Sequence, residues 1–224
     1  MKITIQKEHT FTGHNDCVYT VEPARNPSQF FSGAGDGMVV QWDLLRPNEG
    51  ELIARLPNSI YALHYHTDSD LLIAGHNHNG IHVLDWKNKK EVASLQLTSS
   101  QVFDINSIDN LLFVGTGDGS LITVDLKTLR IVETIKLSDK SIRTIAINSA
   151  LNEVTIGYSD NYIRVLDLAN LHLKYAWQAH TSSVFTLRYL PGTHYLVSGS
   201  RDAHLKVWDS RGGYALINEV VAHM

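Results

Sequence analysis

The sequence predicts an all-β protein, and three observations support that prediction. A short segment that ends in aspartate recurs five times, closing at Asp43, Asp85, Asp125, Asp167 and Asp209. The intervals between these aspartates are 42, 40, 42 and 42 residues, which is too regular to arise by chance. Each repeat holds four short apolar runs separated by polar turns, and no segment has a helical period. Four antiparallel strands in about 41 residues are typical of one blade of a β-propeller.

The strands of each repeat are expected in a fixed order. The first strand is predicted at the alternating runs 18–21, 60–63, 102–105, 142–145 and 184–187. A pair of residues that ends in glycine comes next and is interpreted as a hairpin signal, at 32–33, 74–75, 114–115, 156–157 and 198–199. A turn position then lies seven residues before each closing aspartate, at Asp36, His78, Asp118, Asp160 and Asp202. The third strand ends at the closing aspartate, and a fourth follows a polar turn, as at 51–55 and 131–135.

These elements predict a single propeller domain over residues 1–224 with five complete blades. The expected parts are a closing outer strand at 1–13, blades at 14–56, 57–97, 98–137, 138–179 and 180–222, and the start of a sixth repeat at 223–224. Five full repeats plus one extra strand are not a whole number of blades. We therefore expect a carboxy-terminally incomplete propeller, with a naturally short five-bladed ring as the alternative.

Composition limits the classes of function. Hydrophobic residues make up 43% of the chain and charged residues 19%, which favours a packed core over disorder. The net charge of −4 argues against a broad nucleic-acid surface, because phosphate binding needs clustered Lys and Arg. The single cysteine, Cys17, suits a reducing compartment, and neither a signal peptide nor a long apolar span is evident. We expect a cytoplasmic protein.

The repeats resemble the WD-repeat β-propeller family. Gly13-His14 opens the first repeat and Trp42-Asp43 closes its third strand, and Ala179-His180 and Trp208-Asp209 do the same in the fifth. Repeats two to four keep the aspartate but replace the tryptophan. The resemblance implies a parent ring of seven blades and two structural hydrogen-bonded sets, His14, Ser32, Asp36 and Trp42, and His180, Ser198, Asp202 and Trp208. Because buried imidazole and indole groups need partners, we interpret these histidine–aspartate pairs as structural and not catalytic.

By the same resemblance, a partner would contact residues beside the leading aliphatic residue of each first strand and just before the turn position. The residues that follow the aliphatic residue are Tyr19, Tyr61, Phe103, Arg143 and Phe185. Those that precede it include Ser59, Gln101, Ser141 and Ser183, and those before the turn position include Asn77, Ser159 and Arg201. Aromatic residues and arginine are enriched at interface hot spots, so a collar around the channel mouth is predicted to bind a peptide or loop. Gap filling between blades is the alternative for the aromatic residues.

The predicted function is a non-catalytic scaffold for protein partners, without a cofactor, a metal, nucleic acid or a membrane. The alternative is a propeller enzyme with a polar or metal site in the central channel, where Asp104 and Gln101 are the polar candidates. Five histidines crowd the second repeat, at His64, His66, His76, His78 and His82. His78 occupies the turn position, so a structural or solvated role is favoured over metal binding.

Overall fold

The computed structural model describes residues 4, 6–78 and 80–222. The chain divides into two compact units: unit 1 holds Met1–Ala74 and His82–Ala93, and unit 2 holds Gly75–Ile81 and Ser94–Met224. Unit 1 thus contains the first sheet and most of the second. Unit 2 contains the third, fourth and fifth sheets, together with the turn of the second sheet's central hairpin.

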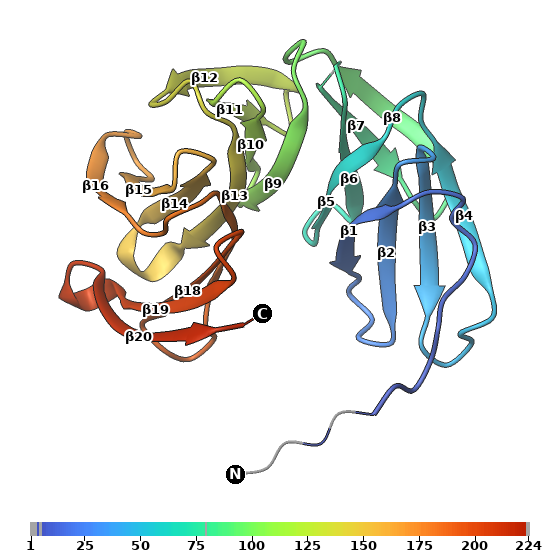
Figure 1. Cartoon of the computed structure of the whole chain (residues 1–224). Coiled ribbons are helices and arrows are strands. Elements are labelled where there is room, and N and C mark those ends of the chain that lie inside the picture. The colour runs from blue at the N-terminus through green and yellow to red at the C-terminus, as the bar shows by residue number, and fades with distance from the viewer. Residues whose placement is uncertain (1–3, 5, 79, 223–224) are drawn as a thin grey trace. The chain divides into compact units, whose positions relative to one another are not determined.

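Five four-stranded antiparallel sheets confirm the predicted repeat, and each sheet pairs its strands in chain order (Figure 1). Unit 1 carries the first sheet, β1 (Val18–Pro23), β2 (Gln29–Ala34), β3 (Met38–Asp43) and β4 (Gly50–Arg55). It also holds most of the second sheet, which is β5 (Ile60–His66), β6 (Leu71–His76), β7 (Gly80–Asp85) and β8 (Lys90–Leu95). The third sheet is β9 (Val102–Ile108), β10 (Leu111–Thr116), β11 (Ser120–Asp125) and β12 (Arg130–Lys136). The fourth is β13 (Ile142–Asn148), β14 (Glu153–Tyr158), β15 (Tyr162–Asp167) and β16 (Leu173–Gln178). The fifth is β17 (Val184–Tyr189), β18 (Tyr195–Ser200), β19 (His204–Asp209) and β20 (Ala215–Val221).

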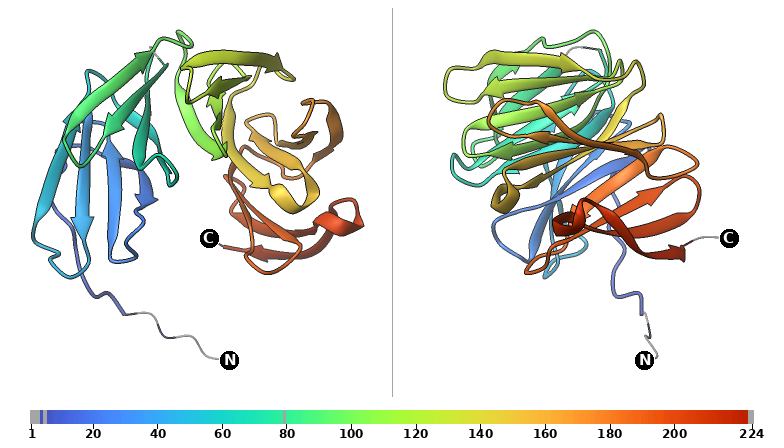
Figure 2. Two further views of the ribbon diagram at one scale, coloured as in Figure 1. Left: turned by 180° about the vertical axis from the view of Figure 1, so that it is seen from behind. Right: turned by 90° about the vertical axis from the view of Figure 1, so that its left-hand side faces the viewer.

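Within each unit the sheets stack through their first strands. In unit 2, β13 of the fourth sheet lies between β9 of the third and β17 of the fifth. The third, fourth and fifth sheets therefore stack in chain order, as Figure 2 shows. In unit 1, β1 lies beside β5. The two helical turns are single 3-10 turns at Ser149–Leu151 and Ser210–Gly212. Among residues 4, 6–78 and 80–222, no helix has the length and hydrophobicity needed to cross a membrane.

In the first four sheets, the glycine of the pair makes room for the next sheet. A Cβ on Gly33 would lie 2.5 Å from Cγ2 of Ile60, and one on Gly115 would lie 2.4 Å from Cγ2 of Ile142. The interpretation of these glycines as turn residues is therefore wrong, because they lie inside β2 and β10. Each provides a hole for the leading aliphatic residue of the following sheet, and close-packed interiors tolerate little extra volume at such a contact.

The core lies between neighbouring sheets. The leading aliphatic residues Ile60, Ile142 and Val184 are fully buried, in clusters with the preceding sheet. The first sheet differs, because its equivalent Val18 is 50% exposed and Val21 is 57% exposed. This outer face of the first sheet is apolar and only partly covered in unit 1.

The predicted terminal strands remain predictions. Residues 4 and 6–13 form no strand, although Phe11 packs edge-on against Phe30 and Trp42 of the first sheet. Residues 1–3 and 5 of the segment on which the closing strand was expected, and the start of a sixth repeat at 223–224, lie outside the described residues.

Candidate functional site

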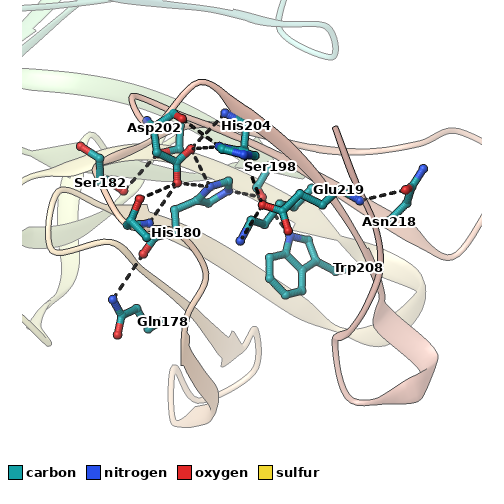
Figure 3. Close-up of polar contacts among 12 residues, drawn as sticks. Gln178, His180, Ser182, Ser198, Asp202, His204, Trp208, Asn218 and Glu219 are labelled. Atoms are coloured by element: carbon teal, nitrogen blue, oxygen red, sulfur yellow. Dashed lines mark hydrogen bonds and ion pairs between the residues drawn. The ribbon is translucent and has the colours of Figure 1, made fainter. Parts of the chain in front are cut away.

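The two predicted hydrogen-bonded sets form with nearly identical geometry. In the first sheet, Nε2 of His14 lies 2.7 Å from Oγ of Ser32, which also accepts the indole N–H of Trp42 at 2.7 Å. Nδ1 of His14 lies 3.2 Å from the Asp36 carboxylate. In the fifth sheet, the corresponding distances are 2.8 Å from His180 to Ser198, 2.8 Å from Trp208 to Ser198, and 3.0 Å from His180 to Asp202 (Figure 3).

The proton positions in each set follow from its donors. Because Oγ of Ser198 accepts from the indole, its own hydroxyl is best satisfied by donating to Nε2 of His180. The proton of the neutral imidazole then lies on Nδ1 and is donated to Asp202. Burial lowers the pKa of His180 despite the neighbouring carboxylate, which agrees with a neutral ring. Burial opposes ionisation of Asp202, but the N–H groups of Thr181 and His204, with His180, outweigh it and lower its pKa well below the ordinary value.

This arrangement resembles a Ser–His–Asp triad, but its surroundings favour a structural role over a catalytic one. Ser198 is completely buried, and its oxygen is fixed between an indole and an imidazole. A nucleophile needs access to substrate and a lone pair directed at it. The hydroxyl of Ser198 has neither, so the set ties the second and third strands of the sheet to the loop that precedes its first strand.

The third and fourth sheets hold the turn aspartate in other ways that the sequence reasoning missed. Asp118 accepts from the Thr116 and Ser120 hydroxyls, at 2.5 and 3.2 Å. Asp160 accepts both terminal nitrogens of Arg164, at 3.1 and 2.8 Å, and the hydroxyl of Ser138 at 2.7 Å. Ser138 stands 22 residues before Asp160, the spacing that separates each of the two histidines from its aspartate. That spacing was the signal that could have identified it.

A buried acid in unit 2 was also missed. Glu153 is 3% exposed and accepts the hydroxyl of Tyr214 at 2.6 Å and Nζ of Lys174 at 2.6 Å. The Tyr214 hydroxyl in turn lies 2.7 Å from that of Tyr189. This network joins the fourth and fifth sheets at the end opposite their first-strand starts. Glu153 and Tyr214 are 61 residues apart, so no local pattern in the sequence pairs them.

The predicted collar residues lie at β-bulges. In the first sheet, Val18 pairs with Ala34 and Thr20 with Gly33, so one residue of the first strand is left without a partner position. The third, fourth and fifth sheets show the same shift, and the residues passed over in the four sheets are Tyr19, Phe103, Arg143 and Phe185. A bulge turns its extra side chain out of the regular alternation. In the fourth sheet, the leading residue Ile142 and the residue after the bulge, Thr144, are buried, while the collar residue Arg143 is partly exposed.

Within each unit the collar side chains contact one another. In unit 1, the rings of Tyr19 and Tyr61 have centroids 4.7 Å apart. In unit 2, the guanidinium carbon of Arg143 lies 4.0 Å from the ring centroid of Phe103 and 5.6 Å from that of Phe185. Its Nε donates to Oγ of Ser159 at 2.9 Å. Tyr19 and Phe185 remain 49% and 48% exposed, and the other collar residues are half-buried.

The serines predicted beside the collar have a second role in packing. The hydroxyls of Ser59, Ser141 and Ser183 donate to the turn carbonyls of the preceding sheet, on Gly35, Gly117 and Ser159, at 3.1, 2.8 and 3.5 Å. Gln101 accepts the hydroxyl of Ser100 at 3.2 Å. The three serine hydrogen bonds hold the start of each first strand, next to the collar residue, against the turn of the preceding sheet. Cys17, at the same position in the first sheet, is exposed.

The turn residues vary in accessibility. Arg201 is exposed, while Ser159 and Asn77 are half-buried. Ser159 supports Arg143, and the carbonyl of Asn77 lies 2.8 Å from Nδ1 of His76.

The histidines of the second repeat take separate partners. Nδ1 of His66 contacts Ser69 at 2.7 Å, that of His82 contacts Glu91 at 3.0 Å, and that of His78 contacts the carbonyl of Ser99 at 3.1 Å. Burial lowers the pKa of His64 to about 4. Among the described residues, no group of three or more histidine, cysteine, aspartate or glutamate side chains is placed to hold a metal ion.

A small hollow lies along the first strands of unit 2. The hollow lined by Asn106, Arg188 and neighbouring residues has a volume of about 120 Å³, against roughly 300–1,000 Å³ for ordinary ligand pockets. Asp104 is held by the N–H groups of Ile145 and Ile105 at 2.6 and 2.9 Å, and burial raises its pKa to about 6. This carboxyl group joins the third sheet to the fourth.

Comparisons with known proteins agree with the repeat. The family described as WD domain, G-beta repeat matches residues 5–43 and 172–209, which are the repeats with complete hydrogen-bonded sets. An uncharacterised WD repeat-containing protein of Schizosaccharomyces pombe is 28% identical over 121 residues, covering 54% of this chain and 30% of the relative. A WD repeat-containing protein 91 homolog of Dictyostelium discoideum is 22% identical over 218 residues, covering 92% of this chain and 28% of the relative. The chain thus spans less than a third of the length of these relatives.

A solved structure shares the fold. A chain in the crystal structure of a mitotic checkpoint complex superposes with a TM-score of 0.79 at 15% identity, covering 99% of this chain and 75% of that one. At this identity the likeness concerns the fold alone.

Proposed function

Because the chain belongs to the WD40-repeat family, whose members are mostly non-catalytic and commonly bind proteins, we propose that it is an interaction scaffold that holds a peptide or loop of a partner protein at the collar. The collar is the set Tyr19, Tyr61, Phe103, Arg143 and Phe185. The observation that carries the proposal is the bulge that turns these side chains out of the core in the first, third, fourth and fifth sheets.

Exposure and chemistry support binding over gap filling. A residue that only filled space between sheets would be buried, whereas Tyr19 and Phe185 are about half exposed. Aromatic rings supply large contact area with few rotatable bonds, and Arg143 is already ordered by its two ring contacts and by Ser159. Little ordering entropy would therefore be lost when a partner covers them. The single cysteine suits a reducing compartment, and we keep the cytoplasm as the proposed location.

Affinity purification with two collar variants tests the proposal. One variant carries Tyr19→Ala and Tyr61→Ala in unit 1, and the other carries Phe103→Ala and Phe185→Ala in unit 2. The matched control is Tyr195→Ala, a half-buried aromatic residue at the opposite end of the fifth sheet.

Each variant is first compared with the parent chain by circular dichroism and thermal unfolding, so that lost binding is not confused with lost folding. We expect at least one collar variant to lose the principal co-purifying protein while the control retains it. If both folded collar variants recover the same partners as the control, the collar is not the binding site.

A further inference from the structure

We infer that the collar of unit 1 selects a basic segment of its protein partner, with Tyr19 and Asp16 as the residues that bind an arginine or lysine side chain. This inference rests on the proposed function and adds the chemistry of the partner. It is argued from the aromatic rings and the charges at the end of unit 1 where β1 and β5 begin.

Two tyrosine rings form an aromatic surface at this end of unit 1. The ring centroids of Tyr19 and Tyr61 lie 4.7 Å apart, with an angle of 46° between the ring planes. Tyr19 is 49% exposed, so part of its ring is open to a ligand. An aromatic face attracts a cation through the quadrupole of the ring, and arginine occurs over such faces more often than lysine. The ring pair is therefore suited to the positively charged group of a partner.

Asp16 adds a carboxylate beside this aromatic surface. Its side chain is exposed, and Oδ1 accepts the N–H of Cys17 at 2.7 Å. The carboxylate covers the turn of the first sheet, because a Cβ on Gly35 would lie 2.6 Å from Oδ2. Repulsion from Tyr61 raises the pKa of Tyr19, with a further contribution from Asp16, so this carboxylate lies within electrostatic range of the ring hydroxyl. Among the residues that the structure describes, no lysine or arginine pairs with Asp16, and its negative charge is available to a partner.

Asp36 supplies a second negative charge at the same end. It accepts the N–H groups of Asn15 and Met38 at 2.8 and 3.0 Å, together with the neutral imidazole of His14. Burial raises the pKa of this carboxyl group, but its backbone N–H donors and His14 outweigh burial and lower the pKa below its ordinary value. Neutral donors stabilise an ionised carboxylate without cancelling its charge. Asp36 therefore adds to the negative potential beside Asp16.

The cations in the described part of unit 1 lie mostly at the other end of its sheets. Those in or beside the turns that follow β1, β3 and β7 are Arg25, Arg46, Lys87, Lys89 and Lys90. Arg55 reaches the collar end only on β4, the outermost strand of the first sheet, where it lies 3.4 Å from Sδ of Met38. Lys7 belongs to the segment that precedes the first sheet. The collar end of unit 1 thus attracts positive charge, which favours a basic partner over an acidic one.

The experiment uses fluorescence anisotropy with a short labelled peptide that alternates arginine with leucine. The matched peptide replaces each arginine by citrulline, which keeps the shape of the side chain and removes its charge. The protein variants are Asp16→Asn, Tyr19→Leu and Tyr19→Phe. The control is Asp68→Asn, which removes the same charge from an exposed residue between β5 and β6, at the opposite end of the second sheet. Each variant is checked by circular dichroism for retained folding.

We expect the arginine peptide to bind more tightly than the citrulline peptide and to weaken as salt rises. Tyr19→Leu should weaken binding by about 3- to 30-fold and Tyr19→Phe by less, because phenylalanine keeps the aromatic face. Asp16→Asn should weaken binding by about 2- to 10-fold, and Asp68→Asn by less than about 1.5-fold.

Equal affinity for the two peptides, or equal losses from Asp16→Asn and Asp68→Asn, overturns the inference. Loss of the natural partner in the Tyr19→Ala, Tyr61→Ala variant would still stand in that case, so the two proposals fail separately.

Discussion

Replacing Ser198 by alanine should be among the most damaging single-atom deletions in the molecule. Its Oγ accepts from the Trp208 indole and contacts Nε2 of His180, both at 2.8 Å, and the residue is fully buried. Ser198→Ala leaves two buried polar groups without that partner. Each such group costs about 1–3 kcal/mol, so the free energy of unfolding of the fifth sheet should fall by about 2–6 kcal/mol.

The first sheet supplies an internal comparison. Ser32 makes the same two contacts, both at 2.7 Å, but it borders a hollow of about 360 Å³ lined also by His14, Val18 and Trp42. Although the hollow is lined mainly by apolar residues, a water in place of the lost hydroxyl would have two polar partners, the indole N–H of Trp42 and Nε2 of His14. Ser32→Ala should therefore cost less than Ser198→Ala.

Urea titrations followed by hydrogen exchange and mass spectrometry would measure both losses sheet by sheet, because the two units need not unfold together. Ser28→Ala is the control, since its hydroxyl bonds only the exposed Asn26 side chain, at 3.1 Å. A loss below about 1 kcal/mol for Ser198→Ala, or an equal loss for Ser32→Ala, would refute the reasoning, since the sets would then not depend on unsatisfied buried groups.

Three further predictions concern packing, pH and association. Gly115→Ala should lower the unfolding free energy by about 1–3 kcal/mol, because its Cβ would lie 2.4 Å from Ile142; an unchanged melting temperature would contradict the glycine-hole contact. Asp202 has a lowered pKa when folded, so its contribution to stability is present above the unfolded pKa of about 4 and is lost as pH falls below it. Acid titration of Asp202→Asn should therefore show a flatter decline than the parent, and parallel curves would refute this. Val18→Asp with Val21→Asp should reduce concentration-dependent association measured by light scattering, because the two valines are 50% and 57% exposed on an apolar face; unchanged association would place the contact elsewhere.

The repeat could be predicted from sequence because its signals are local. The period of the closing aspartates, the alternating runs and the turn positions are all set within about 41 residues, and they fixed five sheets of four strands. The two hydrogen-bonded sets were predictable for a different reason. Histidine, serine, aspartate and tryptophan recur at the same offsets in the first and fifth repeats, and each needs a partner once it is buried.

The contacts between sheets were less predictable because their physical cause lies in another repeat. From the sequence alone, Gly33 was interpreted as a hairpin residue. In the structure, its lack of a side chain leaves space for Ile60 of the neighbouring sheet. The Arg164 pair with Asp160 substitutes for a histidine that the fourth repeat lacks, and its chemistry differs from that of the histidine sets. The bulge likewise could not be predicted, because the run from Val18 to Val21 has the pattern of a regular strand, whereas its register shifts between Val18 and Thr20.

The bulge also explains how one strand can serve packing and recognition together. In the fourth sheet, Ile142 and Thr144 are both buried, because Ile142 packs against Gly115 of the third sheet and Thr144 accepts the N–H of Leu187 in the fifth, while Arg143 between them is partly exposed. The core therefore constrains the residues on either side, whereas the intervening position is free of core packing. That freedom accounts for tyrosine, phenylalanine and arginine at equivalent places in one chain whose leading residues are all valine or isoleucine. A position that varies in chemistry while the residue before it stays valine or isoleucine is where a scaffold can acquire a specific partner without losing its fold.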